Sequence, residues 1–141
     1  MSVSKSMLVG RDLTELAKAA DQLRQWLEAD IDEDGLACVE LAFVEALTNS
    51  ILYGPPDTGQ PISVFVDILD AQVAVEIEDG SPPMPTLFDD AGAHRLEFDV
   101  KDIENLPEGG RGLSLIAISM DEVTFRVTDD RVRLRMVKNR R

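Results

Sequence analysis

The feature that most constrains the fold is an almost wholly apolar stretch of helical periodicity, from about residue 33 to residue 53. Its large apolar side chains recur at helical spacing, at Leu36, Val39, Phe43, Leu47 and Ile51. The sequence Gly54-Pro55-Pro56 follows and would end the helix, because proline cannot continue it. A helix that is apolar on most of its surface has to be buried. The stretch therefore predicts a buried helix.

Two polar side chains interrupt this helix. Glu45 and Asn49 are four residues apart, so they lie on one face. Burying polar groups without partners costs about 2–7 kcal/mol each. A Mg²⁺–nucleotide with a water to be activated would satisfy both side chains, and so would a position at the solvent edge of an amphipathic helix. The segment by itself leaves these two interpretations open.

Length and composition bound the class of protein. The 141 residues fit one domain, residues 1–141, with an ordinary core. We find no run of membrane-spanning length and no secretory pattern at the N-terminus, which favours a cytoplasmic protein without membrane contact. The single cysteine, Cys38, excludes an internal disulfide and fits a small core residue. One histidine and one cysteine, far apart in sequence, argue against a structural zinc site.

The charge of the chain is unevenly distributed. The net charge is −13, yet residues 126–141 hold half of the 14 basic side chains. An acidic body argues against non-specific binding of nucleic acid. The basic segment could bind an anion, but its arginines alternate with Val132, Leu134 and Met136. This alternation favours a last strand whose arginines form a solvated face.

The remaining periodicities give an order of elements. We expect a strand at 3–9, helices at 12–28 and 33–53, strands at 62–68 and 73–77, a long connection at 79–111, a helix at 112–119, and strands at 121–127 and 131–138. Asp12 and Glu15 resemble a capping box at the first helix. The order predicts an α+β fold, a two-layer sandwich whose mixed, mostly antiparallel sheet has helices on one face. A connection as long as 79–111 is typical of a lid or binding loop.

Three segments with chemical potential follow one another along the chain. The first is Glu45-x-x-x-Asn49 on the apolar helix. The second is Glu78-Asp79-Gly80-Ser81-Pro82-Pro83, directly after a buried strand, and the third is Gly109-Gly110-Arg111-Gly112-Leu113-Ser114-Leu115-Ile116, a glycine loop that runs into a helix. Each segment is weak evidence alone, but their order and spacing are much more specific.

On these residues the chain resembles the histidine-kinase-like ATPase superfamily, the Bergerat or GHKL fold. Within it, the likeness is to small stand-alone domains of the anti-sigma factor serine-protein kinase type. Those domains carry an N box (Glu-x-x-x-Asn), a G1 box (Asp-x-Gly-x-Gly or Pro) and a G2 box (Gly-x-Gly-Leu-x-Leu). The likeness covers nearly the whole chain and implies an ATP lid at 80–111.

The resemblance implies an ATP and Mg²⁺ site. Asn49 would coordinate Mg²⁺ through its amide oxygen, a hard ligand that this ion prefers. Glu45 would be the general base that orients a hydroxyl or water toward the γ-phosphate. The G1 box would bind adenine, and the G2 box would offer backbone N–H groups to the phosphates. The residues expected to bind the cofactors are Asn49, Glu78, Asp79, Gly80, Gly110, Arg111, Gly112 and Leu113.

The G1 segment departs from the family pattern. Counted back from Gly80, its acid is Glu78 instead of an aspartate, so either the adenine shifts or Asp79 substitutes with a changed register. Proline follows Ser81 where the family often has its second glycine. Tyr53 stands where close relatives often have histidine. Arg111, and Arg95 and Lys101 in the expected lid, are cationic candidates for phosphate contacts or are solvated.

The resemblance implies a serine/threonine protein kinase that phosphorylates a small STAS-type antagonist of an anti-sigma factor and regulates a sigma factor. Relatives often form homodimers. The alternative is a non-catalytic regulatory binding module of the same fold. Intact Glu45 and Asn49 favour the kinase, whereas Glu78 favours the alternative. A histidine kinase is less well supported, because the chain has no room for a dimerisation helix and its lone His94 lies in the expected lid.

Overall fold

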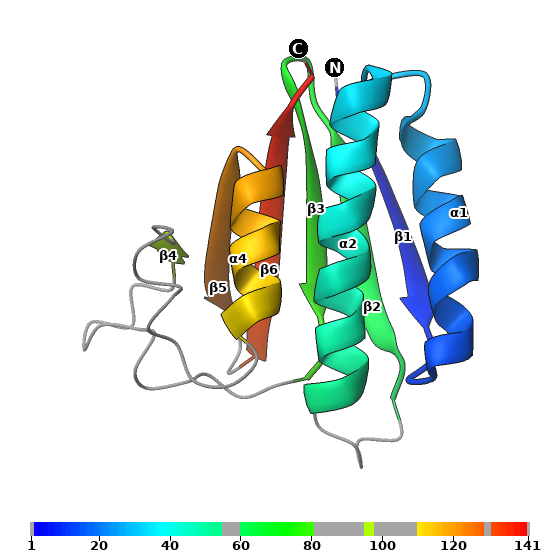
Figure 1. Cartoon of the computed structure of the whole chain (residues 1–141), viewed down its shortest axis with the longest axis vertical. Coiled ribbons are helices and arrows are strands. Elements are labelled where there is room, and N and C mark those ends of the chain that lie inside the picture. Colours follow the sequence, from blue (N-terminus) through cyan, green and yellow to red (C-terminus); the bar gives the residue numbers. More distant parts are fainter. Residues whose placement is uncertain (1, 55–59, 81–94, 98–109, 129–130, 141) are drawn as a thin grey trace.

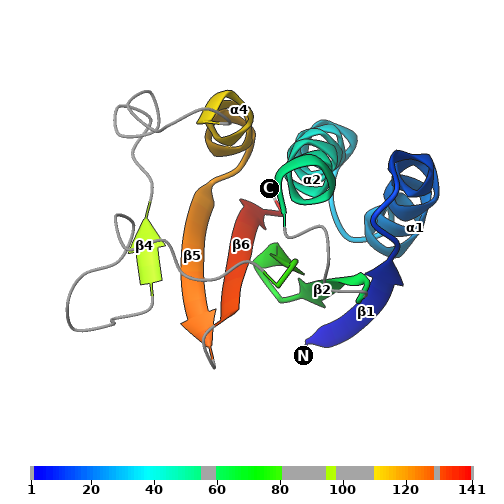
Figure 2. The ribbon, with the colours of Figure 1, turned by 90° about the horizontal axis from the view of Figure 1, so that it is seen from below.

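One antiparallel sheet, with the described helices all on one of its faces, forms the frame of the structure, a computed structural model (Figures 1 and 2). It describes residues 2–54, 60–80, 95–97, 110–128 and 131–140. The elements are β1 (Val3–Val9), a 3-10 turn η1 (Leu13–Glu15), α1 (Leu16–Leu27), α2 (Glu33–Tyr53), β2 (Ile62–Ile68), β3 (Gln72–Glu78), β4 (Arg95–Glu97), α4 (Gly110–Ser119), β5 (Glu122–Thr128) and β6 (Arg131–Asn139).

The sheet has six strands in the order β1-β2-β3-β6-β5-β4. Every neighbouring pair is antiparallel. The α+β class and the two layers are therefore confirmed. The sheet is not mixed as predicted, because its described strands form no parallel pair.

Two details of the expected order need correction. The strand β4 lies inside the segment taken as a lid; three residues are too few for a detectable alternation. Helix α4 begins at Gly110, two residues earlier than expected, so Gly110 and Gly112 belong to its first turn. Most of the expected lid, including His94 and Lys101, lies outside the described residues, as does the turn at Asp129 and Asp130.

The core lies between the helices and the sheet. On β2, residues 62–68 alternate strictly between buried and half-buried positions. The inward residues pack with α1 and α2, and Phe43, Leu23 and Leu27 have no exposed surface. Trp26 packs against this core as predicted, and Lys5 Nζ lies 5.9 Å from the centre of its ring.

Aspartate side chains cap the 3-10 turn η1, which leads into α1, and the helix α2. The Asp12 carboxylate accepts a hydrogen bond from the Thr14 N–H at 2.9 Å, which lowers the pKa of Asp12. The Asp32 carboxylate accepts one from the Gly35 N–H at 2.7 Å and caps α2. Both caps are aspartates, whose short side chains reach the unpaired N–H groups of a first helical turn.

Helix α2 corrects two expectations from the sequence. By length and composition it is long and apolar enough to cross a membrane. In the structure one side of it packs into the core through Leu36, Val39 and Phe43, which is the arrangement of a core helix. Cys38 is half-buried and lies outside the core cluster, so it is not the core residue that its apolar surroundings predicted.

Candidate functional site

The elements that carry the three segments singled out in the sequence meet at one end of the molecule. Helix α2 and strand β3 both end there, and α4 begins there (Figure 1). Helices α2 and α4 also pack against each other. The fold therefore brings the end of the N-box helix, the residues after β3 and the first turn of α4 to the same end.

The helix periodicity places Glu45 and Asn49 on the side of α2 away from α1. On the other flank, Glu40 Oε2 pairs with Arg24 Nε of α1 at 3.3 Å. With 3.6 residues per turn, Asn49 lies about 180° around the helix from Glu40. Because α2 lies between α1 and α4 (Figure 2), the side of α2 opposite Glu40 is the one nearer α4. Glu45, within about 40° of Asn49 on the same helix, shares this flank, and both side chains are half-buried.

Asp79 is the acid on the helix-covered face of the sheet. Side chains alternate along a strand, and Val73, Val75 and Ile77 point into the core. Asp79 continues that series. A Cβ placed on Gly54, the residue after α2, would lie 3.1 Å from Asp79 Oδ2 and would collide with the backbone oxygen of Ser50. The carboxylate of Asp79 is thus packed against the end of α2, one turn beyond Asn49.

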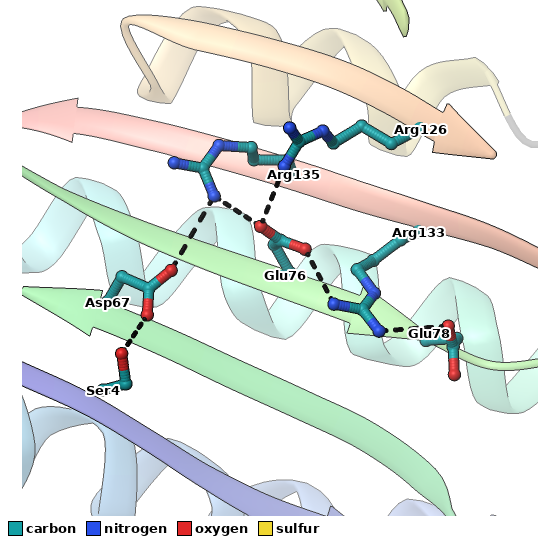
Figure 3. Close-up of polar contacts among 7 residues, drawn as sticks. All are labelled: Ser4, Asp67, Glu76, Glu78, Arg126, Arg133 and Arg135. Atoms are coloured by element: carbon teal, nitrogen blue, oxygen red, sulfur yellow. Dashed lines mark hydrogen bonds and ion pairs between the residues drawn. The ribbon is translucent and has the colours of Figure 1, made fainter. Parts of the chain in front are cut away.

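Glu78 points to the opposite, open face of the sheet. Its Oε1 pairs with Arg133 Nη2 at 3.3 Å (Figure 3). The guanidinium of Arg133 also lies over the ring of Phe65, 4.2 Å from its centre. The structure therefore does not bring Glu78 together with Asn49. The strand alternation in the sequence already indicated this, because two residues beyond Ile77 is Asp79.

Glu78 belongs to a cluster of charges on the open face. Its centre is Glu76, which is only 5% exposed and pairs with Arg126 at 3.6 Å, Arg133 at 3.3 Å and also Arg135 (Figure 3). Asp67 extends the cluster, since its carboxylate lies 3.9 Å from Arg135 and accepts a hydrogen bond from Ser4 at 2.7 Å.

The open-face cluster corrects the expectation for the basic C-terminal segment. The alternation is confirmed, because Leu134 and Met136 are buried on the helix side. Arg133 and Arg135, however, do not form a solvated face: their side chains are 30% and 18% exposed and are paired with carboxylates of β2 and β3. Interstrand pairing explains what the pattern of one strand could not show.

The first turn of α4 contributes backbone N–H groups at this end of the molecule. The first four N–H groups of an α-helix have no acceptor within the helix. In α4 these belong to Gly110, Arg111, Gly112 and Leu113. A helix N-terminus also carries partial positive charge, which favours anions. The side chains of Arg111 and Leu113 lie outside the described part of the structure, so a charge-assisted contact from Arg111 stays a prediction.

Comparison with known proteins bears on this arrangement. A family model described as histidine kinase-like ATPase domain matches residues 9–138, which is nearly the whole chain. The chain belongs to the histidine kinase-like ATPase domain family. No curated protein matches it. The family gives the coarse function: an ATP-binding, kinase-like ATPase domain.

The residues at the site end of this ATPase domain fit an adenine nucleotide with a hard cation. Backbone N–H groups of α4 suit phosphates, and the amide oxygen of Asn49 suits Mg²⁺. Asp79 offers an acceptor for an amine. Gly80, with φ of 85°, adopts a backbone conformation that other residues rarely tolerate and leaves the turn after Asp79 without a side chain. No described cluster of three or more His, Cys, Asp or Glu residues suggests a different metal centre.

Proposed function

We propose that this ATPase domain is an ATP-dependent serine/threonine protein kinase of the anti-sigma factor type. It transfers the γ-phosphate of ATP to a hydroxyl group on a small STAS-type antagonist protein and regulates a sigma factor. The observation that supports the proposal is the packing of the Asp79 carboxylate against the end of α2, the helix that carries Glu45 and Asn49, at the end of the molecule where α4 begins.

Each residue has a role that matches its place. The Asp79 carboxylate accepts a hydrogen bond from the exocyclic amine of adenine, and the N–H groups of Gly110 to Leu113 bind phosphate oxygens. The Asn49 amide oxygen is the protein ligand of Mg²⁺, which neutralises phosphate charge when bound. Because phosphoryl transfer depends mainly on positioning and electrostatics, these contacts supply much of what the reaction needs.

Glu45 is the proposed general base. It lies one helical turn before Asn49 on the same flank of α2, so the base and the metal ligand are held by one rigid element. A carboxylate there accepts the proton of the acceptor hydroxyl as that oxygen attacks phosphorus. The half-buried position limits competition from bulk water while leaving the side chain accessible.

The placement of Glu78 bears on the alternative, a non-catalytic regulatory module. That alternative rested on Glu78 as an irregular G1 acid. With Glu78 paired to Arg133 on the open face, the acid near the end of α2 is Asp79, the residue type that the family pattern asks for. This supports the kinase over the alternative.

Phosphotransfer with γ-labelled ATP and purified STAS-type domains as acceptors tests the proposal. We expect the wild type to label serine or threonine of an acceptor. Glu45→Gln should slow this transfer by about 100-fold or more, which is the usual contribution of a general base, and should leave the Kd for Mg-ATP within about twofold. Glu40→Gln is the matched control, since Glu40 pairs with Arg24 on the other flank and should keep full activity.

Three results would contradict the proposal. Nucleotide binding without labelling of any acceptor would favour the non-catalytic module. Equal loss of binding and transfer in Glu45→Gln would give Glu45 a structural role. Absence of any stabilisation by millimolar Mg-ADP would exclude the kinase and a nucleotide-dependent form of the regulatory module, because a ligand of the folded state must raise the Tm.

A further inference from the structure

Arg11 connects three separate segments at the end of the molecule where α2 and β3 end. It lies in the connection between β1 and η1, and its Nε donates to the backbone oxygen of Gln60 at 2.8 Å. Its Nη2 donates to the backbone oxygen of Asp79 at 2.5 Å. The guanidinium thus joins the residues before β2, the residues after β3 and the chain that follows β1.

The hydrogen bond from Arg11 to Asp79 lies just beyond the end of the pairing between β2 and β3. The last pair of the β2–β3 ladder is Ser63 with Glu78, so Asp79 lies one residue beyond it. Gly80 then turns the backbone, with φ of 85°. Arg11 fixes the carbonyl of Asp79, while Gly54 leaves room for its carboxylate at the end of α2. The backbone carbonyl and the side-chain carboxylate of Asp79 are therefore both fixed in position.

Arg140 provides a comparison for Arg11 within the molecule. At the other end of the sheet, Arg140 also donates to backbone oxygens of separate segments. Its Nε reaches Asp30 at 2.6 Å, its Nη1 reaches Leu69 at 2.8 Å, and its Nη2 lies 3.4 Å from the Asp30 carboxylate. All three nitrogens of Arg140 are used. By contrast, Nη1 of Arg11 is buried with no hydrogen-bond partner in the structure, an arrangement that costs stability.

We propose that Arg11 is a positioning residue of the nucleotide site, which orients the Asp79 carboxylate for adenine by holding the Asp79 carbonyl. The inference rests on the proposed nucleotide site and adds a residue to it. A guanidinium suits the task because its rigid fork donates in two directions at once, to Gln60 and to Asp79. A lysine at position 11 would be a single point donor and would hold only one of the two carbonyls.

The test compares Arg11→Gln with Arg140→Gln in the 141-residue chain, by calorimetric titration with Mg-ADP and Mg-GDP and by thermal unfolding without nucleotide. We expect both variants to lower the Tm, since each loses bonds between segments. Only Arg11→Gln should weaken Mg-ADP binding, by about tenfold, a loss of the order of one hydrogen bond to a charged group. It should also reduce the preference for Mg-ADP over Mg-GDP. Arg11→Lys should fall between Arg11→Gln and the wild type.

Several outcomes would overturn the inference. If Arg11→Gln lowers the Tm but binds Mg-ADP like the wild type, Arg11 is only a structural tie. Equal loss of affinity in Arg140→Gln would mean that general destabilisation weakens binding. If Arg11→Gln does not fold, unchanged Mg-ADP affinity and selectivity in Arg11→Lys would decide against the proposal. A wild type that binds no nucleotide would instead remove the proposed function, and this inference with it.

Discussion

Carboxylates have different surroundings on the two faces of the sheet. On the open face, Glu76 and Glu78 are paired with arginines of the neighbouring strands, so their charges are used within the fold. On the helix-covered face the core is apolar, and beyond its end the Asp79 carboxylate packs against the end of α2, the helix that carries Glu45 and Asn49. The difference separates the acids that join neighbouring strands from the acid that we propose for nucleotide binding, at the end of the layered core.

The contrast is sharpest between two adjacent residues. Glu78 and Asp79 are neighbours in the chain, yet strand alternation sends one to the charge cluster and the other to the end of α2. A substitution at Glu78 should therefore lower only the stability of the fold, whereas a substitution at Asp79 should weaken nucleotide binding. The predictions below separate these two kinds of effect.

The largest loss of stability is expected from Glu76→Ala. Removing this buried carboxylate would leave Arg126, Arg133 and Arg135 without their shared partner, and breaking a buried ion pair costs about 3–5 kcal/mol. Urea unfolding would measure the loss, while the Kd for Mg-ADP should stay unchanged in the folded fraction. Glu28→Ala, at an exposed position after α1, is the control and should change stability by less than about 0.5 kcal/mol. Unchanged stability in Glu76→Ala would break the comparison of the two faces.

A smaller loss is expected from Gly80→Ala. The φ of 85° at Gly80 disfavours a side chain, and the strain costs about 1–2 kcal/mol. The matched control is Gly10→Ala, where an added Cβ would meet only the Glu15 side chain, no closer than 3.4 Å. Chemical denaturation should show a loss in Gly80→Ala and little change in Gly10→Ala. Equal stability of the two variants would mean that the turn after Asp79 is not fixed as described.

The helices and most strands were predictable because their signals are local. Both ends of α2 depend on neighbouring residues: Asp32 caps its start, and Gly54 is the residue after its end. The strands β2 and β6 follow from alternation, which survives because one face of each packs on the core. Such patterns need no knowledge of distant partners.

The features that could not be predicted depend on partners far away in sequence. The pairing of β3 with β6 joins residues 72–78 to residues 133–139, and the ion pairs of Glu76 follow from that pairing. Motif spacing counted from Gly80 also pointed to Glu78, although alternation from Ile77 leads to Asp79. A spacing rule measures position along the chain, whereas the site depends on which face of the strand a residue occupies.

The most direct test compares the stabilisation by Mg-ADP in Asp79→Asn and Glu78→Gln. We predict that Glu78→Gln, which loses one partly exposed ion pair worth about 1 kcal/mol or less, keeps the full rise in Tm that the wild type shows with nucleotide. Asp79→Asn should lose most of that rise, since replacing the acceptor carboxylate should weaken binding by about 100-fold. A full Mg-ADP shift in Asp79→Asn together with a lost shift in Glu78→Gln would contradict the assignment of the two acids to opposite faces.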